Sequence, residues 1–252
     1  MAAAATAGGP GGRIRAVIFD IGGVVVESPF LAIAAYEREQ GLPDNYLNVA
    51  LTKRGAAGAF QQYERGEIGH GEFVRQWARE LNEVEANNEA YRGYLRRRGL
   101  DGRIELPRET RVDGAALFAR MMAATQTPND CVVELIRWLR RCGYRVAALT
   151  NNFKDGAQAS GLGDLLASLF DEVVESAVVG LRKPDPRFYL LACERLGIRP
   201  SEAVFLDDIG SNLRAAARLG MATVRVEIGK EPAAVAAVKR LVAARGAHAA
   251  NL

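Results

Sequence analysis

Histidine is nearly absent from this chain, with only two among its 252 residues. His248 lies among the last residues, and His70 stands in an expected turn between Gly69 and Gly71. A Ser-His-Asp triad, a Cys-His pair and a histidine zinc site all need an imidazole at the site. The scarcity of histidine therefore argues against all three kinds of chemistry.

Cysteine is also scarce, and its pattern is not that of a cross-linked or metal-bound protein. Cys131, Cys142 and Cys193 are widely spaced and include no CxxC pair. Such an odd, scattered set is typical of free thiols in a reducing compartment rather than of disulfides or metal ligands. We therefore expect three buried free thiols and a cytoplasmic location.

Long apolar runs and a strong charge of one sign are both missing. No run approaches the roughly 18 residues that a membrane-spanning helix needs, which argues against an integral membrane protein. The 33 basic and 30 acidic residues leave a net charge of +3. This charge suits an anionic substrate but does not by itself indicate nucleic-acid binding. We expect a small-molecule substrate and neither nucleic acid nor a membrane as partner; the sequence does not indicate the oligomeric state.

Residues 1–13 are expected to form a disordered tail. Met1 to Gly12 are almost all small, and residues 8–12 read Gly-Gly-Pro-Gly-Gly. A transit peptide is the alternative, because acidic residues are absent, but neither arginine nor an amphipathic pattern precedes Arg13.

Short apolar runs recur along the chain and predict buried strands. The first, Ala16 to Phe19, ends at Asp20 and is followed by the turn signal Gly22-Gly23. Helical stretches separate the runs, and this alternation predicts an α/β fold with a doubly wound parallel sheet covered on both faces. The other expected strands cover residues 145–150, 170–176, 203–208 and 222–226.

Several helices between these strands have recognisable ends. Apolar residues at the spacing of one helix face run from Val132 to Leu139, and Gly143 follows as a stop signal. Asp185 is suited to cap a helix that begins at Pro186. A further helix is expected to end at Gly220. Another is expected over residues 231–245 and to pack on the sheet.

The alternation breaks between the first strand and the second. Phe73, Trp77 and Leu81 recur at helical spacing, and no segment of residues 28–126 alternates like a strand. Structureless loops of this length are uncommon in compact domains. We therefore expect a helical cap domain inserted at residues 28–126, and a core built from residues 14–27 and 127–252.

Polar signatures follow the strands of the expected core. Asp20 follows the first strand, Thr150-Asn151-Asn152 ends the second, and Asp207-Asp208 ends the fourth. Lys183-Pro184 precedes a helix. In a doubly wound sheet these positions converge at one crevice, where ligands bind. Together they supply a nucleophile, ligands for a divalent cation and donors for phosphoryl oxygens.

Four of these segments carry a resemblance to a known family. They are FDIGGVV (residues 19–25), LTNN (149–152), RKPDP (182–186) and FLDDIGSN (205–212). In order and spacing they resemble the haloacid dehalogenase superfamily, in the branch that contains the phosphatase domain of soluble epoxide hydrolase and domains fused to acyl-CoA dehydrogenases. The resemblance implies a Rossmann-like core, a helical cap and a magnesium-dependent phosphoaspartyl mechanism.

The resemblance also implies a role for each matching residue. Asp20 would be the nucleophile and a magnesium ligand, and Lys183 would neutralise phosphoryl charge and hold Asp20 ionised. Thr150 would hydrogen-bond the phosphoryl group, assisted by the backbone of Asn151. The remaining implied roles are metal binding by Asp208, Asp207 and the Gly22 carbonyl, and a substrate-side position for Asn212, which would steady the loop.

Each residue also has a structural interpretation without catalysis. Asp185 is suited to capping a helix, Thr150 to ending a strand, and Asn151-Asn152 to forming a turn. Adjacent acids such as Asp207-Asp208 are harder to explain in this way, since they repel unless a cation or lysine is near. Arg96-Arg97-Arg98 is interpreted as a solvated face, with a substrate-facing position in the cap as the alternative.

The chain departs from the family pattern at Gly22. Most phosphatases of the family have an Asp there, which protonates the leaving oxygen and later activates water. Gly22 retains the backbone carbonyl but supplies no acid or base. Dehalogenases of the superfamily have a Tyr near this point and lack the metal-binding Asp pair, and neither feature fits this chain.

Three functions stay open. The first is a slow or selective phosphatase acting on a small phosphorylated metabolite, with water or a cap residue supplying the proton. The second is a module that binds magnesium or phosphate without turnover. The third is another hydrolase of the superfamily, such as a dehalogenase or a phosphonatase.

Overall fold

The computed structural model describes residues 5–6, 12–100, 102–153 and 161–246, and the chain divides into two compact units. Residues 1–27 and 126–252 contain the β-sheet, and we call them the sheet unit. Residues 28–125 are helical, and we call them the helical unit. No helix among the described residues is long and apolar enough to cross a membrane.

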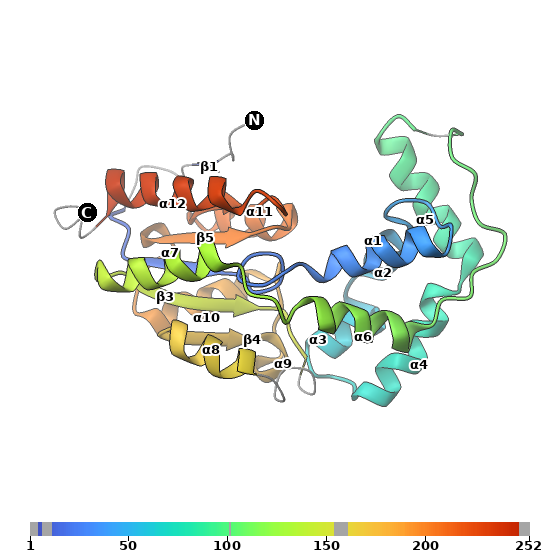
Figure 1. The fold of residues 1–252 in the computed structure, drawn as a ribbon, viewed down its shortest axis with the longest axis horizontal. Coiled ribbons are helices and arrows are strands. Elements are labelled where there is room, and N and C mark those ends of the chain that lie inside the picture. The colour runs from blue at the N-terminus through green and yellow to red at the C-terminus, as the bar shows by residue number, and fades with distance from the viewer. Residues whose placement is uncertain (1–4, 7–11, 101, 154–160, 247–252) are drawn as a thin grey trace. The chain divides into compact units, whose positions relative to one another are not determined.

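The sheet has five parallel strands and one short antiparallel edge strand, in the order β1-β6-β5-β2-β3-β4 (Figure 1). From the central strand β2 the chain proceeds to β3 and β4 on one side, and later to β5 and β6 on the other. This is the doubly wound parallel sheet that the sequence predicts. The strands are β1 (Ala5–Thr6), β2 (Ala16–Phe19), β3 (Arg145–Thr150), β4 (Glu172–Glu175), β5 (Ala203–Asp207) and β6 (Ala222–Arg225).

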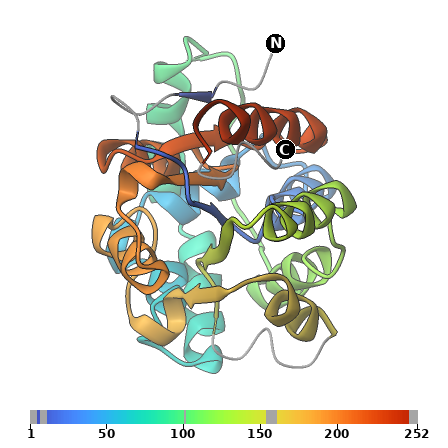
Figure 2. The same cartoon turned by 90° about the vertical axis from the view of Figure 1, so that its left-hand side faces the viewer.

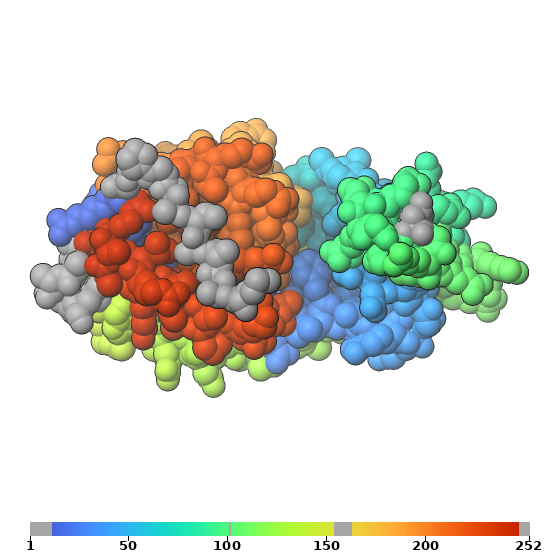
Figure 3. Space-filling model, turned by 90° about the horizontal axis from the view of Figure 1, so that it is seen from above, coloured from blue at the N-terminus to red at the C-terminus, as the bar shows by residue number. Residues whose placement is uncertain are grey.

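Helices cover both faces of the sheet because both faces are apolar (Figure 2). In β2, Val17 and Phe19 belong to one core cluster, and Ala16 and Ile18 belong to the other. The first face is covered by α7 (Asp130–Arg141), α8 (Gly161–Leu169) and α12 (Glu231–Arg245), and the second by α10 (Pro186–Leu196) and α11 (Gly210–Arg218). The outer surface of α12 is visible in red in Figure 3.

Local signals in the sequence account for several helix ends. The Asp185 carboxylate accepts a hydrogen bond from the Arg187 backbone N–H at 2.9 Å, so it caps α10 as predicted. Residues 231–245 form α12 and pack on the sheet, also as predicted. The short helix α9 (Ser176–Val179) and the 3₁₀ turn at Pro200–Glu202 complete the sheet unit.

The helical unit is built around stacked aromatic rings. Phe73 and Trp77, both on α4, are fully buried, and their ring centroids lie 5.2 Å apart. Phe118, on α6, packs edge-on against Phe73 at 4.9 Å. The described part of this unit contains no strand, and its helices are α1 (Pro29–Glu39), α2 (Tyr46–Thr52), a 3₁₀ turn (Gly55–Ala57), α3 (Ala59–Glu64), α4 (His70–Leu81), α5 (Val84–Arg97) and α6 (Gly114–Ala124).

Some expectations need correction. His70 is the first residue of α4 and not part of a turn, since Gly69 occupies the cap position. Only Cys193 is a buried thiol, whereas Cys131 and Cys142 are half-buried; all three are free. The expected tail falls mostly on residues outside the described ranges, as does His248, but residues 5–6 form β1 beside β6.

Candidate active site

Three of the predicted residues lie at the carboxyl edge of the sheet. Asp20 directly follows β2, and its backbone N–H donates to the Leu206 carbonyl of β5 at 2.9 Å. Asp207 is the last residue of β5, and Thr150 is the last residue of β3. Since both strands pair in parallel with β2, their final residues lie at the same edge.

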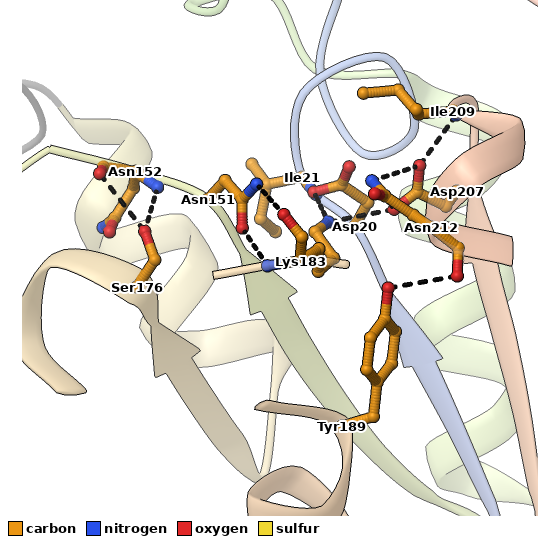
Figure 4. A network of polar contacts seen from close by, with 10 residues as sticks. All are labelled: Asp20, Ile21, Asn151, Asn152, Ser176, Lys183, Tyr189, Asp207, Ile209 and Asn212. Atoms are coloured by element: carbon orange, nitrogen blue, oxygen red, sulfur yellow. Dashed lines mark hydrogen bonds and ion pairs between the residues drawn. The ribbon is translucent and has the colours of Figure 1, made fainter. Parts of the chain in front are cut away.

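Lys183 joins the two carboxylates of this edge (Figure 4). Its Nζ lies 2.6 Å from Asp20 Oδ1 and 3.0 Å from Asp207 Oδ2. The lysine side chain is 1% exposed, so these ion pairs are shielded from water. Burial alone would lower the pKa of Lys183, but the two carboxylates outweigh it and raise that pKa above its ordinary value. Lys183 therefore carries a fixed positive charge beside Asp20.

Asp207 is fully buried and held from several sides. Its Oδ1 accepts the Ile209 backbone N–H at 2.7 Å, and Asn212 Nδ2 lies 3.2 and 3.0 Å from its two oxygens. The hydroxyl of Tyr189 in turn donates to the Asn212 carbonyl at 3.0 Å. Both oxygens of Asp207 are thus engaged by the protein. Asn212, only 3% exposed, holds this carboxylate, which agrees with its expected role in steadying the loop.

Asp208 differs from its neighbour because one of its oxygens has no partner. Its Oδ1 is buried and accepts no hydrogen bond from the part of the chain that the structure describes. Burial, followed by the charge of Asp207, raises the pKa of Asp208 to about 7. One oxygen each of Asp20, Asp207 and Asp208 lies within 4.8 Å of the others. Mg²⁺ binds oxygen ligands, and carboxylates are common among them. A group of three carboxylates with one unpaired buried oxygen therefore fits Mg²⁺.

Asp20 keeps one oxygen available. Its Oδ1 accepts the Ile21 N–H at 2.7 Å and faces Lys183, whereas the described residues donate no hydrogen bond to Oδ2. Burial raises the pKa of Asp20 well above its ordinary value, against the opposing effect of the Lys183 charge. A further positive charge beside it would favour the ionised form.

The turn after Asp20 is tight and apolar. The Ile21 carbonyl accepts the backbone N–H groups of Val25 and Val26 at 2.9 and 3.0 Å. Gly23 has φ 77°, a conformation that favours glycine, whereas Gly22 is not among the glycines with positive φ. The backbone therefore requires glycine at Gly23 but not at Gly22.

The two asparagines of the LTNN segment use their side chains to hold other loops. Asn151 donates to the Lys183 carbonyl at 3.2 Å and accepts from the Lys183 N–H at 2.8 Å. The backbone N–H of Asn152 donates to Ser176 Oγ at 2.9 Å, and its side chain bonds Glu175 and the Ala177 N–H. Each asparagine thus joins the end of β3 to a segment distant in the chain, which the turn-former interpretation does not capture.

Sequence patterns did not indicate two contributors to this network. Tyr189 fits the apolar face of a helix, and nothing local marks its hydroxyl as a hydrogen-bond donor to Asn212. Ser176 follows β4 without any motif, yet it is fully buried. Tyr189 lies one turn after Pro186, the first residue of α10, and therefore near the helix end that follows Lys183. This spacing is the sequence signal that could have indicated Tyr189.

Comparison with known proteins agrees with this arrangement. The family model of haloacid dehalogenase-like hydrolases matches residues 14–220. The chain belongs to this family. It is 34% identical over 218 residues to acyl-CoA dehydrogenase family member 10 of Mus musculus, covering 86% of the chain and 18% of that protein. It is 32% identical over 218 residues to bifunctional epoxide hydrolase 2 of Sus scrofa, covering 84% of the chain and 36% of that protein. This member of the family thus spans much less than half the length of both relatives.

Shorter stretches of this haloacid dehalogenase-like protein resemble enzymes with different names. A glyceraldehyde 3-phosphate phosphatase of Methanopyrus kandleri is 36% identical over 106 residues, 41% of the chain and 45% of that protein. An (S)-2-haloacid dehalogenase of Burkholderia cepacia is 37% identical over 120 residues, 45% of the chain and 50% of that protein. In fold, the chain resembles a family enzyme of Bacteroides thetaiotaomicron crystallised with magnesium and inorganic phosphate, with a TM-score of 0.54 at 20% identity over 86% of this chain and 96% of that one.

Proposed function

We propose that this protein is a magnesium-dependent phosphatase that hydrolyses small phosphorylated metabolites through a phosphoaspartyl intermediate on Asp20. The observation that supports the proposal is that the three carboxylates differ in how many of their oxygens are hydrogen-bonded. Asp207 is saturated by Lys183 and Asn212, whereas Asp20 and Asp208 each keep an oxygen without a hydrogen bond. A structural ion-pair cluster would satisfy all of these oxygens; a site for a cation and a phosphoryl group would not.

The residues of the site would act in two steps. Asp20 Oδ2 attacks phosphorus, and a bond between aspartate oxygen and phosphorus forms while the bond from phosphorus to the leaving oxygen breaks. Water then attacks phosphorus, releasing inorganic phosphate and restoring the Asp20 carboxylate. Lys183 would balance the charge of the equatorial oxygens, and Thr150 and the Asn151 backbone would donate hydrogen bonds to them.

Mg²⁺ would be held by Asp20, Asp208 and the Gly22 carbonyl, with Asp207 close by. When bound, it would neutralise phosphoryl charge and favour the ionised form of the carboxylates. Lys183 would hold Asp20 beside Asp207, the residue that directly precedes Asp208. The arrangement therefore needs little reorganisation when the substrate arrives.

Gly22 restricts the substrates of this phosphatase. Without a carboxyl at this position, the leaving oxygen departs as an anion or takes its proton from water or from another residue. Acyl phosphates and anomeric sugar phosphates have leaving groups that need little help, so we propose that the natural substrate belongs to this class. The general acid–base contribution that is lost is typically about 10²–10⁴-fold.

Two other functions compete with this one. A module that binds magnesium or phosphate without turnover would use the same carboxylates and Lys183. A dehalogenase also needs the Asp nucleophile, and one relative has that name; however, it would have no use for the unpaired oxygen of Asp208. The phosphatase accounts for more of the site than either alternative.

The test is turnover of an activated aryl phosphate with Mg²⁺ by wild type, Asp20→Asn and Gly22→Asp. We expect activity in the wild type, none in Asp20→Asn, and a higher rate on poor leaving groups in Gly22→Asp. Equal rates for wild type and Asp20→Asn across a panel of phosphate esters would support the binding module. Halide release from 2-haloacids without metal would support the dehalogenase.

A further inference from the structure

The helical unit has a groove lined by residues between positions 92 and 108, which include both apolar and charged side chains. Its volume is about 400 Å³, within the range of small-molecule pockets. Leu95, Ile104 and Leu106 form its apolar lining, and Arg92, Arg108 and Glu105 add charges to it. Leu95 is 2% exposed, and both arginines are exposed.

The groove is built by a segment that turns back along α5. The Leu100 N–H donates to the Leu95 carbonyl at 3.0 Å, and glycines with positive φ at Gly99 and Gly102 allow the reversal. Asn88 Nδ2 then donates to the Pro107 carbonyl at 2.9 Å, which fixes the returning segment beside the helix (Figure 1). The wall of the groove is therefore held by hydrogen bonds at both of its ends.

The surface around the groove is strongly basic. Residues 92–111 contain seven arginines but only three acidic residues, whereas the whole chain has a net charge of +3. All seven arginines are exposed, and within the described residues of this segment only Arg111 forms an ion pair, with Glu109. Figure 3 shows the green segment that carries them at the surface of the helical unit.

The fold explains some of these charges but not those of the groove. Arg96 and Arg97 lie in the last turn of α5, where cations interact favourably with the helix dipole. Arg98 lies over the Tyr94 ring at 4.7 Å. Arg92 and Arg108 make no hydrogen bond or ion pair with the described residues, although guanidinium groups readily pair with carboxylates. They are two unpaired cations beside an apolar wall.

We propose that this groove binds an amphiphilic anion: a carboxylate head group with a medium-length alkyl chain. The head would pair with Arg92 and Arg108, and the chain would lie on the half-buried Ile104 and Leu106. The two arginines and Glu105 leave one net positive charge, which favours a single carboxylate over a dianionic phosphate. This binding site shares no residue with the carboxylate cluster and does not depend on the phosphatase activity.

The test is calorimetric titration of the full chain, without metal, with octanoate, decanoate and decanol, each below the concentration at which it forms micelles. Full burial of a methylene tightens binding roughly three- to fourfold and partial burial tightens it less, so decanoate should bind about threefold more tightly than octanoate. Decanol, which lacks the charge, should bind much more weakly than decanoate. Inorganic phosphate should not compete.

Matched variants locate the site. The double variant Arg92→Ala/Arg108→Ala should weaken decanoate binding at least tenfold, whereas Arg75→Ala/Arg137→Ala removes two exposed arginines elsewhere and should leave it unchanged. Leu106→Ser should reduce the difference between decanoate and octanoate. Phosphatase assays on the same variants should show unchanged rates.

The proposal would be overturned by equal decanoate binding in the two double variants, or by binding that does not depend on chain length. It would also be overturned if vesicles of anionic phospholipid bound the protein while monomeric decanoate did not, because the surface would then serve a membrane. None of these outcomes bears on hydrolysis at Asp20, which is measured separately.

Discussion

The side-chain amide of Asn151 forms two hydrogen bonds with the backbone of Lys183, one to its carbonyl at 3.2 Å and one from its N–H at 2.8 Å. The two residues are separated by 32 positions in the chain: Asn151 directly follows β3, and Lys183 lies in the loop before α10. The asparagine therefore fixes the point from which the lysine side chain extends to Asp20 and Asp207. It is a positioning residue for the positive charge of the site.

Replacement of Asn151 by Ala should affect both stability and catalysis. Two hydrogen bonds are lost, so the free energy of unfolding should fall by about 1–3 kcal/mol. With Lys183 less well held, kcat should fall by more than KM rises, because the lysine acts on charge that grows in the transition state. The measurements are denaturant unfolding and steady-state kinetics with an aryl phosphate.

Asn152→Ala is the matched control for this variant. Asn152 also joins the end of β3 to a segment distant in the chain, but its partners are Glu175, the last residue of β4, and Ser176, the first residue of α9. Neither partner belongs to the carboxylate cluster. We expect a comparable loss of stability with little change in kcat. An equal loss of kcat in both variants would mean that Asn151 acts only through general stability.

Removal of the Lys183 charge should strongly destabilise the sheet unit. In Lys183→Met the buried carboxylates of Asp20 and Asp207 lose their shared cation, a change that typically costs about 3–5 kcal/mol. Adding Asp207→Asn removes one of the unpaired charges, so the double variant should regain part of the loss. A double-mutant cycle by urea denaturation measures this coupling, and additive effects would contradict the ion-pair account.

Magnesium binding should depend on pH through Asp208. The pKa of Asp208 is raised to about 7 by burial and then by Asp207, so the metal-free protein holds a proton there that a cation must displace. The affinity for Mg²⁺ should therefore rise with pH and level off above neutrality. The thermal shift produced by Mg²⁺ between about pH 6 and pH 8 measures this.

The same proton makes the metal-free protein sensitive to pH. The folded state keeps it up to about pH 7, whereas the unfolded chain releases it near the ordinary value of 3.8, so stability from this group declines as pH rises through that window. Asp208→Asn should abolish both this decline and the magnesium-induced shift. A shift of equal size at all pH values would contradict a proton on Asp208 that the cation displaces.

Tyr189→Phe tests the outermost contact of the network. The variant keeps the edge-to-face packing on Phe205, at 5.4 Å between ring centroids, and loses the hydrogen bond to the Asn212 carbonyl. We expect a loss of about 0.5–1.5 kcal/mol of stability and weaker magnesium binding. Unchanged stability together with unchanged magnesium affinity would show that Asn212 holds Asp207 without help from Tyr189.

Much of the fold follows from local patterns in the sequence. Apolar runs such as Ala16 to Phe19 predict buried parallel strands because both faces of such strands are covered. Asp185-Pro186 predicts the start of α10 because capping and the fixed φ of proline are local effects. β1 could not be predicted, since its two residues, Ala5 and Thr6, have no strand signal of their own.

The site was predicted in its residue types but not in its connections. The sequence indicates that Asp20 and Asp207 meet, since both stand at strand ends, and the family resemblance adds Lys183 to them. It does not indicate that Asn151 bonds the Lys183 backbone, because asparagine side chains serve turns and long-range contacts equally well. The difference between Asp207 and Asp208 is likewise tertiary, since it depends on Lys183 and Asn212 from distant segments.

The central claim is that Asp20 accepts the phosphoryl group. It is tested most directly by acid quenching of the protein during turnover of an acyl phosphate with Mg²⁺, followed by mass spectrometry of the peptide that contains Asp20. The account predicts one added phosphoryl group on Asp20 in the wild type and none in Asp20→Asn, which should also be inactive. Turnover that persists in Asp20→Asn, or that proceeds in the wild type without phosphoryl on this peptide, would contradict it.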